Sequence, residues 1–105
     1  MDRQISYLHD ALGQKLVAYM VGIEDPREIG RWSKEERAPA PERGKAVQPI
    51  FRTARLLADH GEANSVVRAW FMGMNPQLGE RSPAEVIRDG DTAMAVRAAL
   101  AFVAA

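Results

Sequence analysis

The sequence lacks several side chains on which common protein chemistries depend. Its 105 residues include no cysteine, which excludes disulfide bonds and thiolate catalysis and favours a reducing compartment. Histidine occurs twice, at His9 and His60, and neither has acidic partners at the spacing of metal ligands. Fourteen basic residues cancel fourteen acidic ones, so the basic excess typical of a nucleic-acid-binding protein is missing. We therefore expect neither a metal ion nor a cofactor, and DNA contact has to be argued from a local surface.

Long apolar segments are also missing. Residues 2–4 are polar, so a secretory signal is not expected. The most apolar stretch, residues 93–105, is interrupted by Arg97 and is too short to span a bilayer. With 47% apolar and 27% charged residues, the chain has the composition of an ordinary globular domain. We expect a soluble, cytoplasmic protein with no membrane role.

What is present is a series of helical patterns, because apolar residues recur at steps of three and four and no stretch alternates with period two. The sequence predicts an all-α fold of about seven short helices. Gly13 divides the first apolar series into two helices; the series consists of Ile5, Leu8, Leu12, Leu16 and Met20. We expect two units, residues 1–45 and residues 46–105.

The third helix is predicted from the pattern of a helix start. Asp25 is in position to be the N-cap, Pro26 the first helical residue, and Glu28 the returning member of a capping box. This helix is expected to end near Glu36. Residues 37–45 are interpreted as a connector, because their prolines favour extended backbone.

Two further helices are predicted over residues 46–60 and 62–71. Pro49 either opens or kinks the first of them, because proline cannot donate the internal hydrogen bond. Gly61 is a suitable C-cap residue. The apolar face of the first helix consists of Val47, Ile50, Phe51, Ala54, Leu57 and Ala58, and that of the second of Val66, Val67, Trp70 and Phe71.

The last two helices follow a cluster of turn-forming residues. Ser82 is predicted as an N-cap, Pro83 as the first helical residue and Glu85 as the capping-box partner of a short helix that Gly90 ends. A final helix is capped by Asp91 or Thr92, and its inward-facing residues are expected to be Met94, Val96, Leu100 and Val103.

Ala18 and Gly22 have the inner spacing of a helix-turn-helix. The small residue lets two helices approach, and the glycine takes the left-handed conformation of the turn. Ile29 and Trp32 would then hold the second helix against the first, so Trp32 is expected in the core. This unit resembles the Xre or Cro-type repressor fold, in which an Arg-Trp pair such as Arg31-Trp32 often closes the recognition helix.

The candidate DNA-binding residues of this unit are Arg27, Arg31, Lys34 and Arg37. Residues 27–45 carry six basic groups against four acidic ones. Such a small excess is a weak footprint for phosphate, so useful affinity would need two copies on adjacent half-sites. The alternative is that these helices serve only folding and dimerisation.

The second half does not have the pattern of an enzyme. No serine is paired with a histidine, and no glycine-rich loop is placed to hold a phosphate. Glu80 and Glu85 are interpreted as solvated or capping residues rather than as general acids or bases. What remains is a rigid surface of aromatic and methionine residues beside a turn-rich loop, which is typical of a protein interface. Of Trp70 and Phe71, one is expected to be core.

Three segments in fixed order resemble the toxin-binding domain of Xre/MbcA/ParS-type antitoxins. They are Val67-Arg68-Ala69-Trp70, Met74-Asn75-Pro76-x-Leu78-Gly79, and Arg81-Ser82-Pro83-x-Glu85-x-Ile87 followed by Asp89-Gly90. The resemblance covers residues 46–105, and the preceding helix-turn-helix is similar to the family's N-terminal half.

The resemblance implies the antitoxin of a bacterial type II toxin–antitoxin pair, with a RES-domain toxin that consumes NAD as the partner. In this family the C-terminal half of the antitoxin packs over the toxin's NAD pocket, and the helix-turn-helix often binds the operator of its own operon. The motif residues carried over by position are Trp70, Asn75, Pro76, Leu78, Gly79, Arg81, Ser82 and Pro83. Arg81, Arg88 and the C-terminal tail are the candidates for direct toxin contact.

Two departures from the family pattern affect these expectations. Glu35 or Glu36 stands where a glycine usually follows the tryptophan, which weakens the case for operator binding. The alanine-rich final helix favours steric occlusion of the toxin over insertion of a polar side chain. A homodimer, or a higher assembly with the toxin, is expected. The alternative function is a stand-alone helix-turn-helix transcriptional regulator whose C-terminal half mediates dimerisation.

Overall fold

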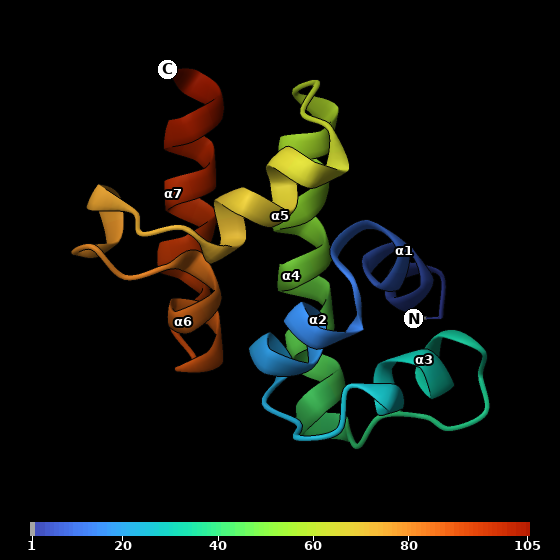
Figure 1. Cartoon of the computed structure of the whole chain (residues 1–105). Helices are drawn as coiled ribbons and strands as arrows, with labels where there is room; N and C mark the ends of the chain where they lie inside the picture. The colour runs from blue at the N-terminus through green and yellow to red at the C-terminus, as the bar shows by residue number, and fades with distance from the viewer. Residues whose placement is uncertain (1) are drawn as a thin grey trace.

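The computed structural model describes residues 2–105, and these residues form seven α-helices and one short 3₁₀ helix, η1. The all-α prediction is confirmed. The helices are α1 (Asp2–Leu12), α2 (Gln14–Val21), α3 (Arg27–Ser33), α4 (Pro41–Asp59), α5 (Asn64–Met72), η1 (Pro76–Leu78), α6 (Pro83–Arg88) and α7 (Thr92–Ala104). The long α4 is the central helix, and α1, α2, α5 and α7 pack directly against it (Figure 1).

One hydrophobic core joins the two halves of the chain. Leu8 and Ile29 from the first half and Ile50 and Phe71 from the second belong to the same buried cluster. A smaller cluster of Leu78, Val86 and Ala98 lies between η1, α6 and α7. Trp70 packs against both clusters, so it connects them.

The boundary expected between residues 45 and 46 lies inside α4. Residues 37–45 were expected to form a connector, and this is wrong from Pro41 onward, because the helix begins there. Ala40 is still extended, with ψ of 149°, and Pro41 occupies the first turn, where a missing N–H costs no hydrogen bond. Pro49 lies within the helix, so it does not open it.

The predicted start of the third helix is partly wrong. The carboxylate of Asp25 does accept a hydrogen bond from the Arg27 backbone N–H, at 3.0 Å, but α3 begins at Arg27 and ends at Ser33. Glu28 does not close a capping box. Its carboxylate instead binds Arg31 and Arg37, because two guanidinium groups compete successfully with the backbone.

The helix-turn-helix spacing is confirmed in its local geometry. Gly22 ends α2 in the left-handed conformation, with φ of +89°, and its N–H bonds to the carbonyl of Ala18. Ala18, Ile29 and Trp32 are buried, so α3 is held against the preceding helices by these side chains.

The orientation of α7 corrects a second expectation. Leu100 is exposed at 49%, whereas the buried residues of α7 are Ala95, Ala98 and Ala99. Alanine is small enough to let α7 approach α4 and α6 closely, whereas Met94 and Val103, expected to face inward, are half-buried against the two clusters. Among the helices of residues 2–105, none is both long and apolar enough to cross a membrane.

Candidate docking surface

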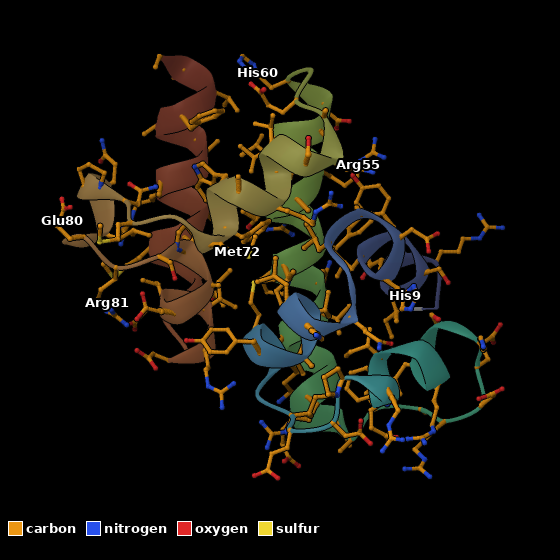
Figure 2. All side chains as sticks on the ribbon, in the orientation of Figure 1. His9, Arg55, His60, Met72, Glu80 and Arg81 are labelled. Carbon is orange, nitrogen blue, oxygen red and sulfur yellow. The ribbon has the colours of Figure 1, made fainter. Side chains whose placement is uncertain are left out.

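The turn-rich segment between α5 and α6 projects from the body of the molecule beside α7 (Figure 1). Glu80 and Arg81 lie at its outer edge, and Met72 lies at the end of α5 nearer the centre (Figure 2). The segment is short and carries backbone hydrogen bonds that close it on itself. It therefore has a defined shape before any partner binds.

Asn75 holds this loop together. Its side-chain oxygen accepts a hydrogen bond from the Gln77 N–H at 2.9 Å, and its backbone N–H bonds to the carbonyl of Arg81 at 3.1 Å. The carbonyl of Asn75 accepts from Leu78 and Glu80, at 2.9 Å and 3.1 Å. An asparagine side chain that satisfies its own turn is a common loop stabiliser, so the motif asparagine has a structural role here.

Two consecutive residues of the loop adopt the left-handed conformation, Gly79 with φ of +66° and Glu80 with φ of +69°. Glycine takes this conformation without steric cost, whereas glutamate rarely does. Leu78 anchors the loop from below, because its side chain is buried against Val86 and Ala98. The backbone hydrogen bonds of Asn75 and the burial of Leu78 together fix the conformation of the loop.

The predicted capping box of α6 is confirmed. The Ser82 hydroxyl accepts from the Glu85 N–H at 3.1 Å, and the Glu85 carboxylate accepts from the Ser82 N–H at 2.9 Å. Hydrogen bonds from the Ser82 backbone, and secondarily from its side chain, hold the pKa of Glu85 below its ordinary value. Gly90, with φ of +95°, ends the helix as expected.

An apolar groove of about 310 Å³ lies between this loop and α7. Its lining residues are Trp70, Met74, Asn75, Pro76, Gln77, Ala98, Ala101, Phe102 and Ala105, and none of these side chains is charged. Met72 and Met74 are exposed at 58% and 76%, and Phe102 at 39%. Exposed methionine and aromatic side chains around a preordered groove are features of protein-binding surfaces.

The predicted toxin-binding residues fall into three groups by burial. Leu78, Ser82 and Pro83 are buried, so their contribution is to shape the surface. Pro76 and Gly79 are exposed on the loop. Asn75 and Trp70 are half-buried, and Phe71, rather than Trp70, is the fully buried member of the aromatic pair.

Both arginines proposed for direct contact already have partners within the chain. Arg81, which precedes α6, forms an ion pair with Asp89, which follows the helix. Arg88 donates a hydrogen bond to the carbonyl of Tyr19 at 2.7 Å, and its guanidinium lies 4.7 Å from the centre of the Tyr19 ring. Arg88 therefore links α6 to α2.

The C-terminal tail was a candidate for toxin contact, but the sequence did not single out Phe102 or the face of α7 that lines the groove. Phe102 and Ala101 line the groove, and Phe102 also stacks edge-on with His60 at 6.5 Å between ring centres. The spacing of Ala95, Ala98 and Ala99 could have identified the buried face of α7, because small residues at three- and four-residue steps can mark a closely packed helix face.

The candidate DNA-binding residues of the first half are also engaged within the chain. Arg27 pairs with Asp25 at 3.1 Å, and Arg31 and Arg37 pair with Glu28 at 2.7 Å and 2.8 Å. Hydrogen bonds from Arg27 lower the pKa of Asp25, and hydrogen bonds from Arg31 and then Arg37 lower that of Glu28. Lys34 is exposed. Within residues 2–105, no three His, Asp or Glu side chains gather as a metal site would require.

Comparison with known proteins adds one solved structure. The chain superposes on a chain of the crystal structure of the Mycobacterium tuberculosis MbcT–MbcA toxin–antitoxin complex, with a TM-score of 0.82. The superposition covers 98% of this chain and 93% of that chain, at 22% sequence identity. No protein-family model and no curated protein matches the sequence. The two chains therefore share a fold over nearly their whole length.

Proposed function

We propose that this chain is the antitoxin of a type II toxin–antitoxin pair and that it neutralises a RES-domain toxin that consumes NAD. One observation carries the proposal. The segments that resemble the antitoxin motif, from Val67 to Gly90, form α5, the preordered loop and α6, on a fold shared with a chain of a toxin–antitoxin complex. The protein has no catalytic part in this proposal.

The docking surface consists of the groove between the Asn75–Arg81 loop and α7, which Met74 lines, together with the exposed Met72 at the end of α5. Its lining is uncharged, so binding would be driven by burial of apolar area rather than by ion pairs. The loop is already ordered, which reduces the entropy lost on association. Neutralisation would then be steric, because the surface covers the entrance to the toxin's NAD pocket.

Co-expression with a RES-domain toxin tests the proposal. We expect the toxin alone to deplete cellular NAD and to stop growth, and co-expression of this chain to restore both. The purified pair should co-elute in size-exclusion chromatography, which would also give its stoichiometry. A stable pair that leaves NAD consumption unchanged would contradict inhibition, and the absence of a complex would contradict the proposal as a whole.

A point substitution tests the surface itself. Met74→Glu places a charge in the exposed part of the groove, where it would lose its hydration on docking. We expect the dissociation constant for the toxin to rise by roughly tenfold or more, as for the loss of a central interface residue. Val66→Glu is the matched control, because Val66 is exposed but does not line the groove. Equal effects of the two substitutions would remove the groove from the interface.

The alternative function, a stand-alone transcriptional regulator, is less favoured, because three of the four candidate DNA-binding residues are held in ion pairs within the chain. Autoregulation of the operon, with two copies of the chain on adjacent half-sites, requires those pairs to open.

A further inference from the structure

The sulfur atoms of this chain are distributed unevenly between the core and the surface. The sequence has five methionines and no cysteine. Among residues 2–105, Met20 is 2% exposed in the core, and Met94 is half-buried against the smaller cluster. Met72 and Met74, by contrast, are exposed at 58% and 76%. The two thioethers that solvent reaches most easily therefore belong to one short segment, at the end of α5 and just beyond it.

These two thioethers are also part of the docking surface. Met74 lines the groove together with Trp70 and Phe102, and Met72 is the last residue of α5 (Figure 2). Both side chains lie outside the two buried clusters of the fold. A chemical change at either sulfur atom would therefore alter the docking surface and leave the packing of the core as it is.

The thioether of methionine reacts directly with peroxides. One oxygen atom of hydrogen peroxide is transferred to the sulfur, so that the O–O bond breaks, an S–O bond forms and water leaves. The sulfur loses the two electrons that the peroxide gains. The product, a sulfoxide, is polar, and its oxygen atom needs a hydrogen-bond donor when it is buried. A cysteine thiolate would compete for the peroxide, and this sequence contains no cysteine.

We propose that Met72 and Met74 form a reversible oxidation site and that their conversion to sulfoxides prevents the toxin from docking. This proposal rests on the antitoxin function proposed above, and it adds a chemical control to the same surface. As thioethers, the two side chains bury apolar area against the partner. As sulfoxides, they bring hydrated oxygen atoms into a largely apolar and uncharged contact. A methionine sulfoxide reductase with a dithiol as electron donor restores each thioether, with water and a disulfide as the other products.

The first experiment measures how fast dilute hydrogen peroxide oxidises each methionine of the isolated chain, by mass spectrometry. Trypsin releases residues 69–81 as one peptide, and its fragmentation between Met72 and Met74 distinguishes the two sites. We expect both to react roughly tenfold faster than Met20 or more, because Met20 is reached only when the core opens. The circular dichroism spectrum should stay unchanged. Oxidation of Met20 at a similar rate, or a loss of helix content, overturns the inference.

The second experiment measures docking. The chain is oxidised alone, freed of peroxide and mixed with a RES-domain toxin. We expect the dissociation constant to rise by roughly tenfold or more, as for the burial of an unpaired polar group, and to return to its starting value after treatment with reductases specific for the two sulfoxide epimers.

Leucine variants assign the effect to these two residues. The variant with both Met72→Leu and Met74→Leu keeps apolar side chains of similar volume, so it should bind as the parent does and become insensitive to peroxide. Met94→Leu is the matched control, because Met94 does not line the groove, and its binding should remain sensitive. Equal peroxide sensitivity of the double variant and the parent overturns the inference.

Two further results separate this inference from the antitoxin function. In the preformed complex, Met72 and Met74 should be oxidised more slowly than in the free chain, because the toxin covers them. Equal rates in the two states overturn the inference, and so does an oxidised chain that binds with an unchanged dissociation constant. Failure of the unoxidised parent to bind a RES-domain toxin contradicts the antitoxin function itself, and the inference falls with it.

Discussion

At the scale of single residues, arginine is used to complete the ends of helices. Arg68 donates to the carbonyl of Ala11 at 2.8 Å, Arg43 to that of Val21 at 3.2 Å, and Arg88 to that of Tyr19. These carbonyls lie in the last turns of α1 and α2, where the helix itself supplies no donor. In the sequence, Arg88 was a candidate for toxin contact. Its internal partner, Tyr19, lies 69 residues away, so no local pattern could connect the two.

Glu35, like Glu80 in the loop, is poorly suited to its backbone conformation. Glu35 follows α3 with φ of +61°, and its N–H and that of Glu36 close the helix end by bonding to the carbonyls of Trp32 and Arg31. This is the position at which glycine usually ends a helix. The sequence left Glu35 or Glu36 as the residue in place of the expected glycine, and the positive φ of Glu35 identifies it.

We predict that Glu35→Gly stabilises the protein by about 0.5–1 kcal/mol, because glycine removes the steric cost of the left-handed conformation and only part of this gain is lost to unfolded-state entropy. Glu36→Gly removes the same charge at a residue without positive φ, so we expect it to be neutral or destabilising. Urea denaturation of both variants measures the difference. A stabilisation shared by both would assign the effect to charge instead.

At the scale of elements, the short α6 was predictable, and so was the body of the long α4, but the start of α4 was not. The signals of α6 are local, since Ser82, Glu85 and Gly90 each act within a few residues of the helix. The start of α4 depends on whether Pro41 belongs to the connector or to the first helical turn, and the sequence allows both. The faces of α7 were obscured by alanine, which is compatible with burial and with exposure.

The capping box makes the stability of α6 dependent on pH. Because its pKa is lowered in the folded state, Glu85 stabilises the fold above its unfolded pKa, and this contribution is lost as the pH falls through the lowered value. We predict that the parent is more stable than Glu85→Gln at neutral pH and that the difference shrinks as the pH falls below about 4.5, the usual glutamate value. Thermal unfolding at several pH values measures the difference, and a gap that widens in acid would contradict the prediction.

At the scale of the whole molecule, the two expected units share one core and one helix. The radius of gyration is 12.8 Å, close to the value of about 13 Å for a single compact domain of 100 residues. Both α1 and α2 pack against α4, and α1 also packs against α5. The resemblance to the antitoxin motif drew attention to the turn-rich loop in the second half, but no pattern in the sequence indicated that α4 continues across the boundary.

We predict that the chain unfolds in a single cooperative transition, because the buried cluster crosses residue 45. The two tryptophans report on the two halves separately. Trp70→Phe leaves Trp32 as the only indole, and Trp32→Phe leaves Trp70. In each variant, the fluorescence midpoint in urea should coincide with the midpoint from far-ultraviolet circular dichroism. Separate midpoints in either variant would mean that the halves unfold independently.

The continuity of α4 also limits how such a protein can acquire a new partner. A crossover between two homologous genes near residue 45 would join two half-helices whose apolar faces, with Val47 and Ile50, had been fitted to different first halves. Exchange of a whole recognition module is therefore unfavourable in this fold. At the proposed docking surface, single substitutions at exposed positions such as Met74 and Phe102 leave the shared core untouched, so they are the easier route to a changed partner.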